Sequence, residues 1–260
     1  MSNEIVQSNE AGYVLRSPYL KARASVYYTT FENQTKTNSF YHDVERSFVN
    51  FTLTGIDKKH LGTELAVEAK VFSGLTVNAV AAIGQYTYNS RPSAFISQDN
   101  NAEILEENQT IYAKNFYVAG TPQSAFSGGL SYRSSKFWFA NLNFNYFTNS
   151  WLDFNPSRRT AGAVDLVEYD SDLWNTIIDQ ELNPSAFTVD FFGGKSWRIN
   201  RKYFINLNVG VSNILNNKNF ITGGFEQLRF DFEGKDVNKF PPRYYYSYGT
   251  NYFMSVTFRM

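Results

Sequence analysis

The stretch "YFINLNVGVS" (203–212) decides the fold class, because its apolar residues recur at every second position. A period of two is typical of a β-strand whose two faces meet different surroundings. The stretch therefore predicts a strand with one apolar and one largely polar face. The apolar face carries Tyr203, Ile205, Leu207, Val209 and Val211, and the other face carries Phe204, Asn206, Asn208, Gly210 and Ser212.

The same alternation recurs along the whole chain and predicts an all-β, antiparallel protein. The count comes to about nine strands if 49–72 is one long strand that bends or bulges at "GIDKKH" (55–60). The other predicted strands are one near 10–16, followed by 20–28, 75–88, 123–133, 138–146, 186–199, 203–212 and the final residues 251–260.

Short and long connections alternate between these strands, so all short turns are expected at one end of the sheet and all long loops at the other. The only helical pattern is "SDLWNTIIDQEL" (171–182), with Ser171 or Asp172 as its N-cap. The predicted short turns are 16–19, 72–75, 133–136 and 199–202, and the predicted long loops cover roughly 33–48, 89–122, 150–185 and 215–248.

Composition excludes several classes of protein. The 260 residues contain no cysteine, so neither a disulfide nor a thiol nucleophile is available. Lys plus Arg equals Asp plus Glu at 24 each, which argues against nucleic acid as a partner. No run of about 18 apolar residues predicts a transmembrane helix. The start, "MSNEIVQSNE" (1–10), lacks the features of a signal peptide.

Aromatic residues make up 18% of the chain and gather near the predicted strand ends. Trp138 and Tyr146 lie on one face of a strand, which in a tilted barrel strand places them roughly 20 Å apart along the barrel axis. That spacing approximates the lipid-facing band of an outer-membrane barrel, and short turns opposite long loops fit the same architecture.

The final strand raises the question of closure. Its apolar face, which would meet lipid and be read during barrel assembly, consists of Tyr252, Met254, Val256, Phe258 and Met260. Membrane β-proteins must close, and nine antiparallel strands cannot close on themselves without one parallel pair. The chain is therefore expected to be part of a larger barrel.

Five segments together resemble the TonB-dependent receptors of outer membranes. They are "YLKARASVYYTTFENQT" (19–35), "GIDKKHLGTELAVEAKVFSGLTVNAVAAIG" (55–84) with Gly62 and Glu64 as a Gly-x-Glu element, "WLDFNPSRRT" (151–160), "VSNILNNKNF" (211–220) and "FPPRYYYSYGTNYFMSVTFRM" (240–260). The third and fifth resemble the large receptors of the Bacteroidota. The chain departs from the family in ending on Met260 rather than on an aromatic residue.

The resemblance implies an antiparallel transmembrane β-barrel of about 22 strands, with short periplasmic turns, long extracellular loops and an N-terminal plug. Residues 1–260 would be the C-terminal part of that barrel, without the plug and the first strands. The implied location is the outer membrane of a Gram-negative bacterium. The implied partners are outer-membrane lipid, the plug and remaining strands, the TonB system and a surface lipoprotein. The implied function is energised uptake of a siderophore, glycan, peptide or cobalamin, without enzymatic activity or cofactor.

Chemistry-bearing residues are few. No catalytic motif occurs, and the two histidines, His42 and His60, are predicted to be solvated. Four carboxylates fall in one long loop, where a calcium site and a solvated acidic loop are the alternatives. They are Asp165, Glu168, Asp170 and Asp172.

Loop aromatics with nearby arginines suit contacts to a sugar, peptide or chelate. Packing of loop on loop or loop on plug is the other interpretation. The candidates are Trp151, Phe154, Arg158, Arg159, Trp174, Arg243, Tyr244, Tyr245 and Tyr246.

Two other functions stay open. The first is a complete small outer-membrane barrel, either a pore or a membrane hydrolase, which would need an even strand count. The second is a soluble carbohydrate-binding β-domain, which would use the polar strand face as its ordinary solvent surface.

Overall fold

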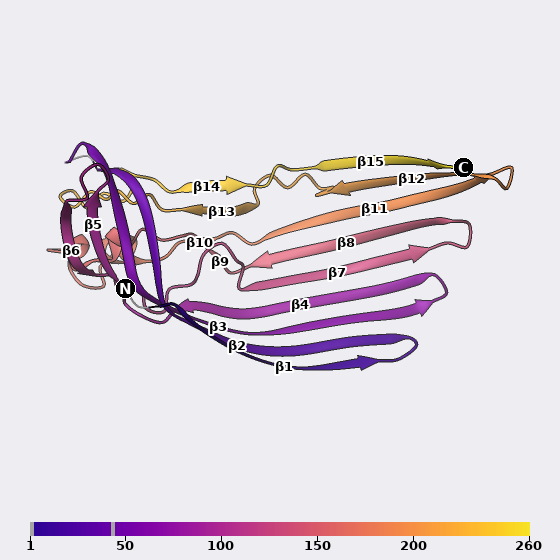
Figure 1. Ribbon diagram of the computed structural model, residues 1–260, viewed down its shortest axis with the longest axis horizontal. Coiled ribbons are helices and arrows are strands. Elements are labelled where there is room, and N and C mark those ends of the chain that lie inside the picture. Colours follow the sequence, from indigo (N-terminus) through magenta and orange to yellow (C-terminus); the bar gives the residue numbers. More distant parts are fainter. Residues whose placement is uncertain (1–2, 43–44) are drawn as a thin grey trace.

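The computed structural model describes residues 3–42 and 45–260. Its main element is one antiparallel sheet of eleven strands, of which nine are the predicted strands and lie side by side in chain order (Figure 1). In order across the sheet they are β1 (Ile5–Arg16), β2 (Leu20–His42), β3 (Ser47–Phe72), β4 (Leu75–Tyr88), β7 (Ser124–Arg133), β8 (Trp138–Thr148), β11 (Ala186–Ile199), β12 (Tyr203–Ser212) and β15 (Asn251–Arg259).

The strand register gathers the apolar positions on one face of this sheet. Leu142 of β8 pairs with Leu130 of β7 and Phe191 of β11, and Leu65 of β3 pairs with Ala24 and Ala81. The opposite face carries side-chain ladders, including the hydrogen bonds from Ser131 to Asn141, from Ser127 to Asn145 and from Asn145 to Asp190. The predicted two-faced strands are therefore confirmed.

The apolar face is covered by nothing in the described chain. Leu65, Leu142 and Met254 expose 46%, 43% and 68% of their surfaces. A soluble sheet would bury this face under a second layer, because exposed apolar patches of this extent are rare on soluble proteins. The hydrocarbon layer of a membrane is the environment that suits this apolar face.

The predicted bend in the third strand is confirmed. β3 runs unbroken from Ser47 to Phe72, and its register with β2 shifts near Gln34. Gly55 has φ 66°, a conformation that suits a residue without a Cβ, and the Asn33 amide donates to Asp57 Oδ1 at 2.9 Å. The bulged stretch thus keeps its hydrogen bonds while the strands change direction.

The first predicted long loop, 33–48, is wrong over most of its length. β2 and β3 are 23 and 26 residues long, whereas a strand crosses a membrane in about 9–11 residues. Their outer halves turn away from the sheet toward β5 (Ser93–Gln98) and β6 (Ile104–Thr110), at the left of Figure 1. The sequence of residues 33–42 lacks the apolar alternation of a strand, because one face of this part of β2 contains Lys36 and Asn38 beside Phe40.

The other long connections hold short elements. The predicted helix is confirmed as α1, with Ser171 as its N-cap, although it ends earlier than predicted. These elements are β9 (Ser150–Trp151), η1 (Pro156–Arg159), η2 (Ala161–Val164), α1 (Asp172–Ile178), β10 (Leu182–Asn183), β13 (Ile221–Phe225) and β14 (Arg243–Tyr246).

The buried apolar cluster lies at one end of the sheet, where the outer half of β3 extends beyond the apolar face. It joins the outer half of β3 to β5 and to the segments around Ile111 and Phe154. We call this folded region the cap, comprising residues 32–42, 45–58, 88–122, 149–185 and 213–250. The cluster consists of Val49, Phe51, Leu53, Ile56, Tyr88, Ala94, Ile96, Ile111, Ala113 and Phe154. The connections therefore form a packed unit with its own core.

Aromatic side chains border the apolar face at both of its ends. Near the short turns, Tyr132 packs on Trp138 with centroids 5.0 Å apart, and Tyr203 stacks on Phe258 at 5.7 Å. Toward the cap, Phe126 lies beside Tyr146 at 6.3 Å. Two aromatic borders around an apolar band match the girdles of a membrane barrel.

His60 is not solvated as predicted. It is half-buried on the polar face of the sheet, with its ring 4.9 Å from that of Phe31 and 4.8 Å from that of Tyr86. The sequence pattern identified the bend but not the neighbouring strands whose rings cover this histidine. His42 lies at the end of β2, where Nδ1 accepts a hydrogen bond from the Glu45 amide at 3.3 Å.

Gly62, part of the Gly-x-Glu element, makes room for a ring. The Tyr27 side chain crosses over it and its hydroxyl hydrogen-bonds that of Tyr86. A Cβ at position 62 would overlap the Tyr27 hydroxyl and lie 3.1 Å from the Ile83 carbonyl oxygen. The glycine is needed here for space rather than for an unusual backbone angle.

We expect Gly62→Ala to lower the free energy of unfolding by about 1–3 kcal/mol, the usual cost of overpacking. Gly128→Ala is the matched control, because a Cβ there meets no atom within 4 Å. Urea titration of each variant in detergent micelles measures the difference. Equal stability of the two variants would contradict the packing role of Gly62.

Candidate functional site

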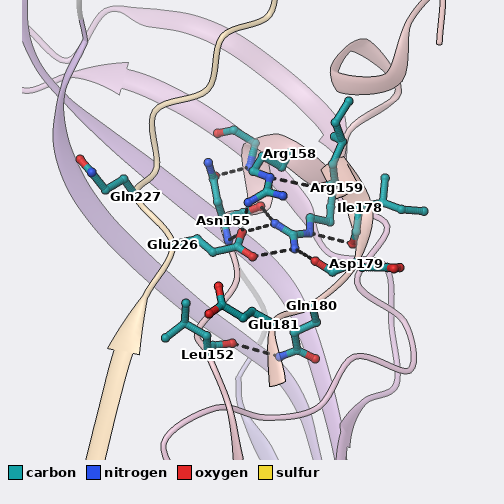
Figure 2. A network of polar contacts seen from close by, with 12 residues as sticks. Leu152, Asn155, Arg158, Arg159, Ile178, Asp179, Gln180, Glu181, Glu226 and Gln227 are labelled. Carbon is teal, nitrogen blue, oxygen red and sulfur yellow. Dashed lines mark hydrogen bonds and ion pairs between the residues drawn. The ribbon is translucent and has the colours of Figure 1, made fainter. Parts of the chain in front are cut away.

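A buried arginine holds the cap together (Figure 2). The Arg159 side chain is 0% exposed and forms an ion pair with Glu226 through both terminal guanidinium nitrogens, Nη1 and Nη2. It also donates to the carbonyl oxygens of Asn155, Ile178 and Asp179 at 3.1, 3.2 and 2.6 Å. A buried charge requires such complete pairing, and the planar donors of arginine suit it.

Glu226 receives further contacts from the same loop. Its Oε2 accepts a hydrogen bond from the Asn155 amide at 2.8 Å and lies 3.3 Å from Nη1 of Arg158. Arg158 in turn donates to the carbonyl oxygens of Thr176 and Ile177 at the end of α1. This Arg159–Glu226 clamp ties together η1, α1 and the segment that follows β13.

Backbone contacts continue the clamp. The Glu226 amide donates to the Asp153 carbonyl at 2.8 Å, and Asp153 forms an isolated parallel bridge with Phe225. On β14, the Tyr244 hydroxyl donates to Glu181 Oε1 at 2.5 Å. Burial, and secondarily this hydrogen bond, raises the pKa of Tyr244 to about 12, so the phenol can donate this bond even at alkaline pH.

A cavity of about 510 Å³ lies beside the clamp. Its walls come from the outer half of β2, residues 153–156 and residues 224–229. Its volume is in the range of small-molecule sites. The cavity joins three segments that are far apart in the sequence, and the clamp holds two of them in contact.

The nine candidate ligand residues fall into three groups. The first group makes contacts inside the cap and consists of Phe154, Arg158 and Arg159. Phe154 is 6% exposed in the core, and both arginines bind Glu226. Trp151, Trp174 and Tyr244 are half-buried, and Arg243, Tyr245 and Tyr246 are exposed. Phe154 and Tyr245 line the 510 Å³ cavity. The contribution of all nine to ligand binding stays a prediction.

The half-buried tryptophans have specific neighbours. Trp151 stacks on Tyr117 with centroids 4.6 Å apart and planes inclined by 5°. Trp174 lines a second, smaller cavity of about 460 Å³ together with Phe116 and Ile178. Loop-on-loop packing, the alternative interpretation, thus accounts for a share of these aromatic residues.

The calcium candidates are not brought together. Within residues 3–42 and 45–260, no group of three or more Asp, Glu, His or Cys side chains could hold a metal ion. Asp170 instead accepts a hydrogen bond from Asn175, and Asp172 lies in the first turn of α1. Two of the four carboxylates thus serve the start of α1 rather than a shared metal.

The final strand is present, but one predicted member lies beyond it. β15 ends at Arg259, so Met260 falls one residue outside. Tyr252, Met254 and Val256 pair with the apolar face of β12, as Phe258 does. The role of this face in barrel assembly stays a prediction.

Sequence reasoning missed Glu226, Asp153 and Lys36. Glu226 is 67 residues from Arg159, and no local pattern marks a charge that will be buried. Lys36 falls in the predicted loop 33–48, but its Nζ lies 2.7 Å from Asp153 Oδ2 across the cavity. Only the folded cap reveals these pairs.

These features define a class of protein. An antiparallel sheet with an uncovered apolar face, aromatic borders and long connections at one end is the wall of an outer-membrane β-barrel. The described residues contain no helix long and apolar enough to cross a membrane.

The chain belongs to the TonB-dependent receptor-like β-barrel family, whose model matches residues 2–214. Members are transporters rather than enzymes and lie in the outer membrane of Gram-negative bacteria, which is the location of this chain. Family membership favours a TonB-dependent receptor over a pore, a membrane hydrolase or a soluble β-domain. No curated protein sequence matches the chain.

Three solved structures share the fold. The siderophore receptor PirA from Acinetobacter baumannii aligns at TM-score 0.53 and 11% identity over 97% of this chain. The copper transporter OprC aligns at 0.52 and 15% over 97%, and the ferric-catecholate import receptor Fiu from E. coli K12 at 0.50 and 15% over 98%. The chain spans 31%, 30% and 27% of their lengths. These matches give no support to the Bacteroidota likeness.

Proposed function

We propose that this chain forms the C-terminal barrel wall and part of the ligand-binding cap of a receptor that takes up a nutrient with energy from TonB. The observation that carries the proposal is that the sheet and the cap are continuous. A lipid-compatible sheet continues directly, through β2 and β3, into a folded cap with a cavity. Candidate cargoes are a siderophore, a glycan, a peptide or cobalamin.

The edges of the sheet suggest the partners. Within the described chain, β1 and β15 each pair with one strand, and an unpaired edge is costly in lipid. The remaining barrel strands would cover both edges, and the polar face would contact a plug. The TonB system would act through that plug. Outer-membrane lipid would surround the apolar face, and a surface lipoprotein is a further candidate partner above the cap.

The absence of cysteine permits a clean test of this orientation. Tyr248 is 92% exposed in the cap, and Ser135 is exposed in a short turn at the opposite end. We expect a membrane-impermeant maleimide to label Tyr248→Cys but not Ser135→Cys on intact cells, and to label both after lysis. Labelling of Ser135→Cys on intact cells would contradict the proposed orientation.

Energised uptake is tested separately. Cells that express the full-length receptor containing this chain would be grown with ferric enterobactin, cobalamin or maltoheptaose as the limiting nutrient, with TonB present or deleted. We expect growth on one of these nutrients to require both the protein and TonB. Growth that is independent of TonB, or no growth advantage from the protein on any of them, would overturn the transport proposal.

A further inference from the structure

The short-turn end of the sheet, at the right of Figure 1, carries an excess of positive charge. The turns that join β7 to β8 and β11 to β12, with the strand ends beside them, cover residues 131–139 and 193–205, which contain no Asp or Glu. None of their cations pairs with a carboxylate in the part of the chain that the structure describes. These cations are Arg133, Lys136, Lys195, Arg198, Arg201 and Lys202.

Lys195 lies on the apolar face of the sheet, where a charge needs an explanation. It pairs in register with Trp138 of β8 and Leu207 of β12, so its side chain shares their face. Its Nζ lies 5.8 Å from the centroid of the Trp197 ring, which is 40% exposed on the same face. The stem of a lysine can cover apolar surface while its ammonium group reaches the polar layer of a membrane. Lys195 therefore suits the level at which hydrocarbon gives way to headgroups.

Two more lysines lie along the same border. Lys202 lies over the Tyr203 ring at 5.3 Å, and Tyr203 belongs to the aromatic border near the short turns. The turn that contains Lys136 accepts a hydrogen bond from the Ser196 amide at 2.9 Å, so this turn lies beside Lys195. The three lysines follow the border across the ends of β8, β11 and β12, and we call them the lysine patch.

The opposite border of the apolar face lacks such cations. At the cap end, the same four strands consist of residues 124–127, 143–148, 186–191 and 209–212, which contain no Lys or Arg. Asp190 carries the one charge there, and it lies on the polar face, where it accepts a hydrogen bond from Asn145 at 2.8 Å. Positive charge at the border is therefore a property of one side of the membrane and not of lipid-facing strands in general.

The position of the lysine patch restricts what it can contact. The remaining barrel strands would pair with β1 and β15 at the sheet edges, and the plug would contact the polar face. Neither of them reaches the border of the apolar face, so lipid headgroups are the surroundings of the lysine patch. Each cation near an anionic membrane surface adds to the attraction, whereas a zwitterionic headgroup carries an ammonium group that balances its phosphate.

We propose that the lysine patch binds the phosphate of a phospholipid with a net negative headgroup, such as phosphatidylglycerol. The lysines contact the phosphate, and the aromatic border contacts the first carbons of the acyl chains. The assignment of this border to the periplasmic leaflet rests on the proposed receptor orientation, whereas the headgroup preference does not. Labelling of Ser135→Cys on intact cells would thus change the leaflet and leave the preference intact.

A local fluorescent probe tests the proposal in the full-length receptor that contains this chain. Ile199 is 43% exposed on the apolar face, between Lys195 and Lys202 in the chain, so Ile199→Cys as the single cysteine can carry a bimane label. In vesicles of phosphatidylcholine, brominated phosphatidylglycerol should quench the label more strongly than brominated phosphatidylcholine. Lys195→Gln combined with Lys202→Gln should lower the relative association constant of phosphatidylglycerol by roughly fivefold for each cation.

Two further variants separate the lysine charges from other effects, each measured in a barrel shown to be intact by its heat-modifiable band. Lys195→Arg combined with Lys202→Arg keeps both charges and should keep the preference. Arg259→Gln removes a cation from the polar face at the same end, where Arg259 pairs with Phe204, and should change nothing. Equal quenching by the two lipids, a preference that survives the double glutamine variant, or displacement by inorganic phosphate at constant ionic strength would overturn the inference. None of these results affects TonB-dependent growth, which tests the receptor function separately.

Discussion

Replacing Glu226 by glutamine is expected to lower the free energy of opening of the cap by about 3–5 kcal/mol, the usual cost of breaking a buried ion pair. The glutamine would leave the Arg159 charge buried without its counter-ion, and Arg159 is 0% exposed. Hydrogen exchange of the amides in 155–160 and 224–229 measures the change. The nine-stranded sheet should keep its protection, because the clamp lies wholly within the cap.

The exposed ion pair between Lys239 and Asp231 provides the matched control in the same cap. Its atoms lie 3.1 Å apart, but 53% of the Lys239 side chain is exposed. Lys239→Ala should therefore cost less than about 1 kcal/mol. An equally small effect of Glu226→Gln would show that the clamp does not hold the cap closed.

A double variant separates charge from packing. Arg159→Met combined with Glu226→Leu removes both buried charges, so it should recover part of the stability that Glu226→Gln loses. Recovery should be incomplete, because Arg159 also serves three backbone carbonyl groups. A double variant less stable than Arg159→Met alone would contradict this account.

Replacing Leu142 by arginine is expected to lower the free energy of unfolding in lipid by about 2–4 kcal/mol. Leu142 lies on the apolar face, midway along β8 between Trp138 and Tyr146, and is 43% exposed with apolar residues on both sides. A cation there would face the middle of the hydrocarbon layer. Urea unfolding in lipid vesicles, followed by loss of the heat-modifiable band, measures the effect.

The neighbouring position gives the control. Asn143 lies on the polar face and pairs with Asp190 of β11. Asn143→Arg places the same charge next to a carboxylate and away from lipid, so the change should stay within about 1 kcal/mol. If both variants were equally stable, the apolar face would not be the lipid face.

The sequence was sufficient for the nine-stranded sheet because a strand in lipid has to separate its two faces. Tyr203–Ser212 and Trp138–Thr148 show that separation residue by residue. The bend near Gly55 and the helix N-cap at Ser171 could also be predicted, since both depend on neighbours within a few residues. Local rules therefore carried these predictions.

The fold of the cap could not be predicted from local sequence patterns. Residues 33–42 are predicted as part of a loop, yet they continue β2, with Lys36, Asn38 and Phe40 on one face. That face is acceptable only because Asp153, more than a hundred residues later, supplies a counter-charge. The candidates Phe154 and Arg159 likewise carry no local sign of burial.

The sequence by itself determined the two-faced antiparallel sheet, its short turns and the resemblance to TonB-dependent receptors. The tertiary structure alone decided that the long connections form a packed cap, that Arg159 is clamped by Glu226 and that a cavity lies beside them. The physical reason is the range of the interactions. Alternation reports the solvent on each side of a strand, whereas burial and ion pairing depend on which distant segments meet.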